Sequence, residues 1–152
     1  MRFLGNIEAK TDAKGRAFLP AVFRKVLQAA GEETLVLRKD VFQKCLVLYP
    51  ESVWNARLDM LKANLNLWKP AHMQMLRQFM KGAETLTLDG NGRFLLSKQL
   101  LKAACIEGQD IQFIGMDDII EIWAPQQLEA NMLSDEEFGT EFENIMNSER
   151  EQ

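Results

Sequence analysis

Residues 11–24 read TDAKGRAFLPAVFR, and residues 88–97, LDGNGRFLLS, repeat the centre of that pattern. Each copy has an aspartate, then a glycine and an arginine three and four residues later, and then an apolar run. Aspartate first and glycine fourth favour a tight turn, because aspartate accepts hydrogen bonds from its own backbone and glycine takes a positive φ. Such a turn suits a short hairpin. We therefore expect two hairpins, with Arg16 and Arg93 on the same side as the first residues of the returning strands.

The elements around the turns repeat as well. Residues 7–12 alternate between apolar or small and polar side chains, as a half-buried strand does. A short helix is expected after each turn, starting near Pro20 or Ser97 and ending at Gly31 or Gly108. Two apolar strands then follow in each copy, at 34–37 and 46–49 in the first and at 111–114 and 120–123 in the second. An internal repeat of this order indicates two tandem modules.

The repeated pattern resembles the MraZ family, bacterial regulators with two AbrB-like (SpoVT-AbrB) modules. The matching residues of the first copy are Asp12, Lys14, Gly15, Arg16, Pro20 and Arg24. The resemblance implies an α+β fold, in which two tandem AbrB-like modules of the swapped-hairpin βαβ type form a pseudo-symmetric small barrel with linker and C-terminal helices. On this basis we expect the first module at 1–50, a helical linker at 51–82, the second module at 83–125 and an acidic helical tail at 126–152.

The linker and the tail have helical patterns of their own. Apolar residues from Trp54 to Leu65 are spaced four, three and four apart, which is one face of a helix, and a second helix is expected to end near Gly82. An apolar face of this kind fits a core or an oligomer interface better than a ligand groove. Ser134 with Glu137 reads as a capping box that opens a last, acidic helix.

The net charge of −4 conceals an uneven distribution. Residues 1–50 carry nine basic and five acidic side chains, a net charge of +4, whereas residues 133–152 carry one basic and seven acidic side chains, a net charge of −6. The basic beginning favours a polyanionic partner. An uneven but merely solvated surface is the other interpretation of the charge alone.

An arginine held by a neighbouring carboxylate is positioned to bind phosphate or a guanine edge with two hydrogen bonds. A structural ion pair is the alternative, although a turn needs the aspartate and glycine but not the arginine. The expected DNA-binding residues are therefore the two Asp–Arg pairs and the nearby basic side chains: Lys10, Asp12, Lys14, Arg16, Arg24, Asp89 and Arg93. In the second copy Asn91 stands for Lys14 and Leu101 for Arg24. We therefore expect the first copy to make most of the phosphate contacts.

By the same resemblance the chain would be a sequence-specific DNA-binding regulator of the division and cell-wall gene cluster, usually a repressor, that also controls its own promoter. It would bind short direct repeats of double-stranded DNA as a ring-shaped homo-oligomer in the cytoplasm, associated with the nucleoid. The alternative is a ring-forming interaction module whose partner is a protein. Binding that does not depend on Arg16 would distinguish this alternative.

Other classes of function find little support in the sequence. There is no glycine-rich phosphate loop, no Gly-x-Ser-x-Gly motif and no clustered cysteine spacing, and His72 is the only histidine. We therefore expect neither an enzyme nor a metal or cofactor site. No apolar run is long enough for a membrane span, and the N-terminus lacks a secretory signal pattern, so a cytoplasmic protein without membrane contact is expected.

Overall fold

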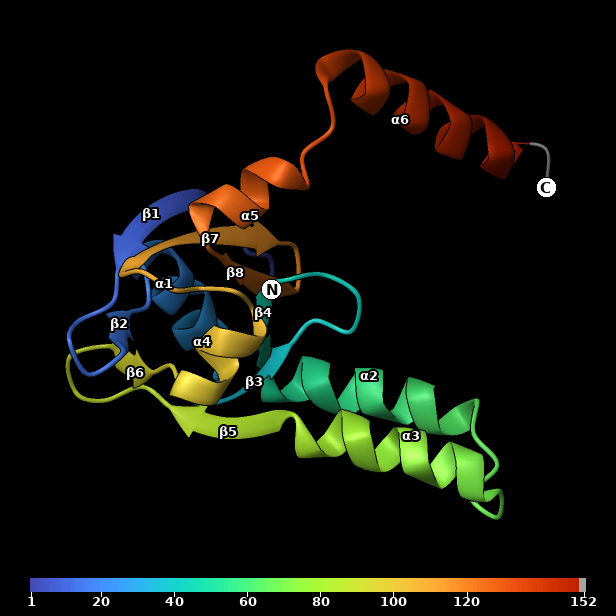
Figure 1. Cartoon of the computed structure of the whole chain (residues 1–152), viewed down its shortest axis with the longest axis horizontal. Helices are drawn as coiled ribbons and strands as arrows, with labels where there is room; N and C mark the ends of the chain where they lie inside the picture. The colour runs from blue at the N-terminus through green and yellow to red at the C-terminus, as the bar shows by residue number, and fades with distance from the viewer. Residues whose placement is uncertain (151–152) are drawn as a thin grey trace.

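The structure, a computed structural model, describes residues 1–150 of the chain (Figure 1). Six strands form one antiparallel sheet in the order β1-β7-β8-β4-β3-β5. Its strands are β1 (Asn6–Lys10), β3 (Thr34–Lys39), β4 (Leu46–Pro50), β5 (Ala83–Thr87), β7 (Asp110–Met116) and β8 (Ile119–Trp123). Two further short strands, β2 (Arg16–Phe18) and β6 (Arg93–Leu95), pair only with each other.

Strand pairing joins the two repeats into one unit. The first strand of each repeat pairs with the third strand of the other, since β1 pairs with β7 and β5 pairs with β3. The fourth strands, β4 and β8, pair at the centre of the sheet. Replacing each strand by its counterpart in the other repeat gives the same strand order, read from the opposite edge. The repeat in the sequence is therefore also a repeat in the topology.

The mixed α+β class is confirmed, but the closed barrel is not. Within residues 1–150, β1 and β5 remain open edges, and β2 and β6 form a separate ladder of three residues each. The sheet stays open because β1 and β2 share hydrogen bonds only at the first turn. Beyond that turn β2 diverges from β1 and pairs with β6. The strands are thus arranged as a sheet and a ribbon.

Helices α1 (Ala21–Ala30) and α4 (Lys98–Ala103) follow β2 and β6. Phe23 and Leu27 lie four residues apart on one face of α1 and are buried. The ring of Phe23 packs edge-on against those of Phe3 and Phe113, so α1 closes the core over the sheet. As predicted, Ser97 caps α4, accepting a hydrogen bond from the backbone N–H of Leu100.

Helices α2 (Glu51–Ala63) and α3 (Pro70–Lys81) form a hairpin that extends from one end of the sheet (Figure 1). Trp54 is the one fully buried residue of its expected stripe, and its ring stacks on Phe79 with centroids 5.3 Å apart. The hairpin therefore has a small aromatic core of its own near the sheet.

After α5 (Pro125–Ala130), helix α6 (Asp135–Arg150) extends away from the rest of the molecule (Figure 1). The expected capping box is confirmed, because Ser134 Oγ accepts from the backbone N–H of Glu137, and the Glu137 carboxylate accepts from the Ser134 N–H. Residues 151 and 152 of the expected tail lie outside the described residues. Between residues 1 and 150, no helix is long and apolar enough to cross a membrane.

Candidate nucleic-acid interface

The first turn is held together by one carboxylate. Asp12 Oδ1 accepts hydrogen bonds from the backbone N–H groups of Lys14 and Arg16, both at 2.9 Å. Asp12 Oδ2 accepts from Arg16 Nε at 2.8 Å. Gly15 closes the turn, donating its N–H to the Asp12 carbonyl at a φ of 85°. The predicted turn is confirmed, and Arg16 leaves it with its guanidinium anchored.

The second turn repeats this network bond for bond. Asp89 Oδ1 accepts from the N–H groups of Asn91 and Arg93, and its Oδ2 accepts from Arg93 Nε, each at 2.9 Å. Gly92 has a φ of 81° and donates its N–H to the Asp89 carbonyl. The difference between Lys14 and Asn91 has no effect on the turn, because each contributes only its backbone. The two arginines are therefore presented in the same way.

These hydrogen bonds stabilise the charged form of both aspartates. The pKa of Asp12 is lowered chiefly by the backbone hydrogen bond from Arg16, with further contributions from the Arg16 side chain and the Lys14 backbone. The pKa of Asp89 is lowered in the same way, chiefly by the backbone hydrogen bond from Arg93. Both carboxylates are therefore ionised at neutral pH and can hold their arginines.

The ribbon formed by β2 and β6 brings the two turns together. Arg16 pairs with Leu95 and Phe18 pairs with Arg93, and paired residues of an antiparallel ladder face the same side. The middle residues face the other side, where Ala17 is buried in the core opposite Phe94. One face of the ribbon is thus core, and the other carries both arginines. A two-stranded ribbon of this width can enter the major groove of B-form DNA.

Arg24 lies at the second turn, not beside Arg16. Its Nη1 donates to the Asn91 carbonyl at 3.3 Å, and a Cβ on Gly92 would collide with the Arg24 side chain. The cause is the antiparallel pairing of β2 with β6, because the end of β2 lies beside the turn that precedes β6. The Leu19 N–H accordingly donates to the Gly92 carbonyl. Because Leu101 stands for Arg24 in the second copy, the sequence predicted that the second turn lacks this basic neighbour. That prediction is wrong, since Arg24 itself lies at the second turn.

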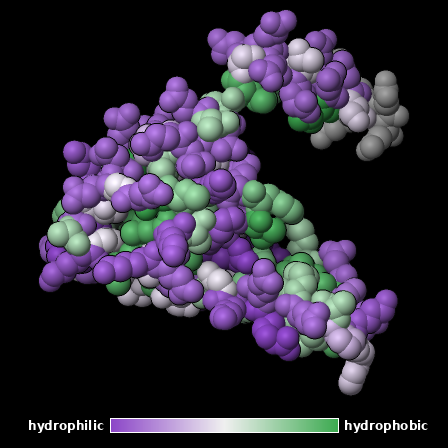
Figure 2. Space-filling view, in the orientation of Figure 1, coloured by the Kyte–Doolittle hydropathy of each residue, from purple (hydrophilic) through white to green (hydrophobic). Residues whose placement is uncertain are grey.

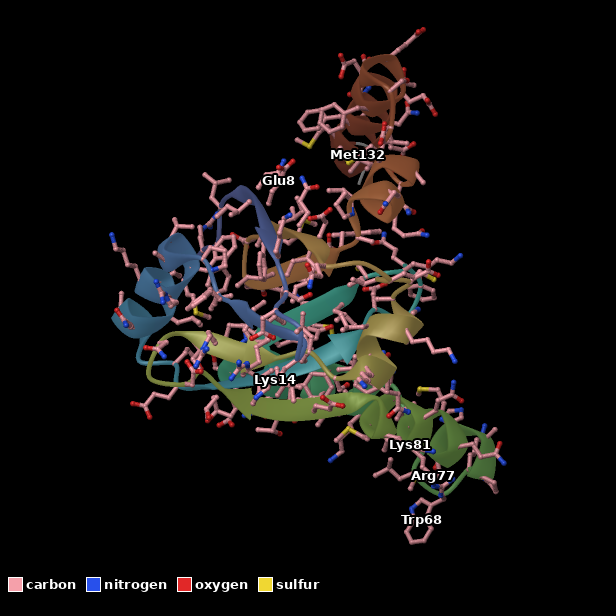
Figure 3. All side chains as sticks on the ribbon, turned by 60° about the vertical axis from the view of Figure 1, so that its left-hand side comes forward. Glu8, Lys14, Trp68, Arg77, Lys81 and Met132 are labelled. Carbon is pink, nitrogen blue, oxygen red and sulfur yellow. The ribbon has the colours of Figure 1, made fainter. Side chains whose placement is uncertain are left out.

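The two lysines lie in different surroundings near the first turn. Lys10, at the end of β1, is 3.7 Å from the carboxylate of Asp110, its register partner on β7. Lys14 lies at the tip of the turn with an exposed side chain (Figure 3). Lys14 is therefore the freer of the two to meet a phosphate.

Two exposed apolar residues on the ribbon were missed by the sequence analysis. Phe18 and Leu95 are 58% and 55% exposed on the face that carries the arginines, and the Arg93 guanidinium lies 5.8 Å from the Phe18 ring centroid. In the sequence they belong to continuous apolar runs, which read as buried. Their exposure could be predicted only from the alternation of side chains in a ribbon that has one buried face, which distinguishes them from the buried Ala17 and Phe94.

The remaining polar side chains offer no second site of this kind in the described part of the chain. Residues 1–150 contain no group of three His, Cys, Asp or Glu side chains placed to hold a metal ion. His72 accepts a hydrogen bond at Nδ1 from the Asn66 N–H, so it closes the loop before α3.

Comparison with known proteins gives one consistent result. The family model described as MraZ protein matches the chain twice, over residues 2–78 and 79–145. A protein named transcriptional regulator MraZ from Phocaeicola vulgatus is 58% identical over 146 residues, which cover 96% of this chain and 94% of the relative. Relatives of the same name from Bacteroides thetaiotaomicron and Rhodospirillum rubrum are 55% and 34% identical, covering 100% and 85% of this chain and 97% and 83% of their own lengths.

Proposed function

The chain belongs to the MraZ family, and we propose that it is a DNA-binding transcriptional regulator that reads DNA through its two Asp–Arg turns. Its relatives are transcriptional regulators by name, and the family is one of regulators, so the chain is not an enzyme. The observation that carries the proposal is the duplicated turn. Both copies anchor an arginine on the exposed face of one ribbon through the same hydrogen bonds.

The anchoring geometry favours base recognition. Arg16 and Arg93 each bind their aspartate through Nε, so the two terminal nitrogens stay available for the bidentate contact that arginine makes with guanine. The basic residues around the turns would bind phosphates and fix the ribbon in the groove: Lys10 and Lys14 at the first turn, Arg24 at the second.

The finer details of regulation follow from the family resemblance. The protein would act as a repressor of the division and cell-wall gene cluster, including its own promoter, and would bind short direct repeats while associated with the nucleoid. Both turns lie on one short ribbon, so one chain would meet one copy of the repeat, and other subunits of an oligomer would meet the other copies.

A ring-shaped homo-oligomer would supply the affinity that one small ribbon lacks, since several linked modules bind repeats with avidity. Two surfaces support self-association. On α6, Phe138, Phe142 and Ile145 are exposed and lie four and three residues apart, on one face of the helix. Figure 2 shows hydrophobic surface among the hydrophilic residues of this outlying helix. A groove between the β3–β4 loop and the α2–α3 hairpin is lined by seven apolar or aromatic residues together with two arginines and two glutamines: Arg38, Val41, Phe42, Tyr49, Arg57, Leu61, Ala71, Gln74, Met75, Gln78 and Phe79.

That groove also favours the second candidate function, a ring-forming module that binds a protein. Phe42 is 93% exposed at its rim, and Arg57 is held at 3.0 Å by Asp118. A protein bound there would be insensitive to changes at the ribbon. The two candidates are therefore separable by substitutions in the turns.

The test is a gel-shift titration against the chain's own upstream promoter DNA, at two salt concentrations and with unrelated competitor DNA. We expect a competitor-resistant shift that weakens steeply with salt and is lost in Arg16→Ala. The matched control is Arg77→Ala, since Arg77 is an exposed arginine on the α3 hairpin, away from Lys14 (Figure 3). The absence of a shift from folded protein at either salt concentration would reject the proposal in favour of the protein partner.

A further inference from the structure

We propose that Phe18 and Leu95 contact the methyl groups of thymine in the major groove, an inference that rests on the proposed DNA-binding function. Both side chains are more than half exposed on the outer face of the β2–β6 ribbon. Each lies beside an arginine of a turn, because Phe18 pairs with Arg93 and Leu95 pairs with Arg16. The ribbon thus presents two arginines and two apolar side chains to whatever it binds.

The core does not need these two residues. The inner face of the ribbon is filled by Ala17 and Phe94, which are 1% and 4% exposed and belong to the main hydrophobic core. Phe18 and Leu95 belong to neither buried cluster. Their apolar surface is therefore available to a partner.

The surroundings of Phe18 and Leu95 favour DNA as that partner. An apolar protein surface covering them would also remove the Asp12–Arg16 and Asp89–Arg93 pairs from water, which is costly unless every charge is satisfied again. A major groove offers acceptors on guanine and phosphate to the arginines, and it offers the thymine methyl to an apolar side chain. One surface thereby satisfies both kinds of residue.

The spacing is also suitable. Phe18 and Leu95 are diagonal neighbours across an antiparallel pair, which places them about 7–8 Å apart. Successive base pairs are separated by about 3.4 Å along the helix axis. The two side chains can therefore reach methyl groups about two base pairs apart, and each would add sequence preference that the arginines alone do not have.

The experiment uses the full chain and two versions of its upstream promoter DNA, one normal and one synthesised with deoxyuridine in place of thymidine. This replacement removes every thymine methyl and leaves the hydrogen-bonding groups of the bases unchanged. We expect wild-type protein to bind the methyl-free DNA more weakly, by about fourfold for each contacted methyl. The double variant Phe18→Ala/Leu95→Ala should bind normal DNA with a similar loss and should no longer distinguish the two DNAs.

The matched control is Trp68→Ala, which removes an exposed aromatic side chain from the loop between α2 and α3 and should leave the preference for methylated DNA intact. Equal binding of both DNAs by wild-type protein would overturn the inference while leaving the proposed function standing. A preference that persists undiminished in the double variant would overturn it too. Failure of folded wild-type protein to bind either DNA would overturn the proposed function and this inference with it.

Discussion

At the scale of single residues, the ionised aspartate is the centre of each turn. Asp12 and Asp89 each accept three hydrogen bonds within four residues, two from the backbone and one from an arginine. An exposed ion pair alone stabilises a protein very little. Here the backbone hydrogen bonds hold the carboxylate in a fixed position, so the guanidinium has a fixed acceptor.

This arrangement predicts a specific acid titration. The folded-state pKa values of Asp12 and Asp89 lie below the ordinary value of 3.8, so the charged forms stabilise the fold above that pH. The stabilisation is lost as the pH falls through the folded-state pKa. Carboxyl ¹³C chemical shifts should give both midpoints below 3.8. In Arg16→Ala the midpoint of Asp12 should rise only partly, because the larger contribution comes from the backbone N–H of residue 16, which remains. Midpoints at or above 3.8 in wild-type protein would contradict this account.

At the scale of the turn, glycine is required for two separate reasons. Gly15 and Gly92 have positive φ angles, and a Cβ on Gly15 would stand 2.9 Å from the Leu96 carbonyl oxygen. Gly90 lies in the second turn without a positive φ and has open space around it. Gly90 is therefore a matched control for substitutions at Gly15 and Gly92.

We predict that Gly15→Ala and Gly92→Ala each lower the free energy of unfolding by about 1–2 kcal/mol. Gly90→Ala should remain within about 0.5 kcal/mol of wild type. Urea denaturation followed by circular dichroism measures all three. Equal free energies of unfolding for the three variants would contradict the claim that the positive φ angles at Gly15 and Gly92 require glycine.

Features held by short-range interactions could be predicted from the sequence, and features held by long-range strand pairing could not. The turn at Asp12 and the cap at Ser134 depend on hydrogen bonds between residues at most four apart, and both were predicted. The position of Arg24 and the exposure of Phe18 depend on the pairing of β2 with β6, which lie far apart in the sequence. No local pattern specifies that pairing, so Arg24 was assigned to the first turn and the exposure of Phe18 was not predicted. The open sheet was missed for the same reason.

At the scale of the whole molecule, strand exchange makes the two halves depend on each other. The β2–β6 ribbon places the helix of each repeat beside the turn of the other: Arg24 of α1 lies over Gly92, and Leu101 of α4 lies near Gly15. The second turn therefore gains a basic neighbour from the first repeat. The prediction that the first copy makes most of the phosphate contacts therefore no longer has support from Arg24.

Helix α6 provides the test of self-association. Its apolar face is exposed in the single chain, and we predict that Phe142→Asp produces a species of lower mass than wild type. Thr140→Asp adds the same charge about 160° away around the helix and should leave the mass unchanged. Sedimentation velocity distinguishes the species. A wild-type protein that is monomeric at all concentrations would contradict both the ring and the role of α6.

The central claim is that both turns bind DNA equivalently, and the affinity of Arg93→Ala for the promoter tests it most directly. Fluorescence anisotropy should give a dissociation constant about tenfold or more above that of wild type, matching the loss in Arg16→Ala within about threefold, while Arg77→Ala binds as wild type. Wild-type affinity in folded Arg93→Ala would contradict the claim and would reduce the second Asp–Arg pair to a structural copy of the first.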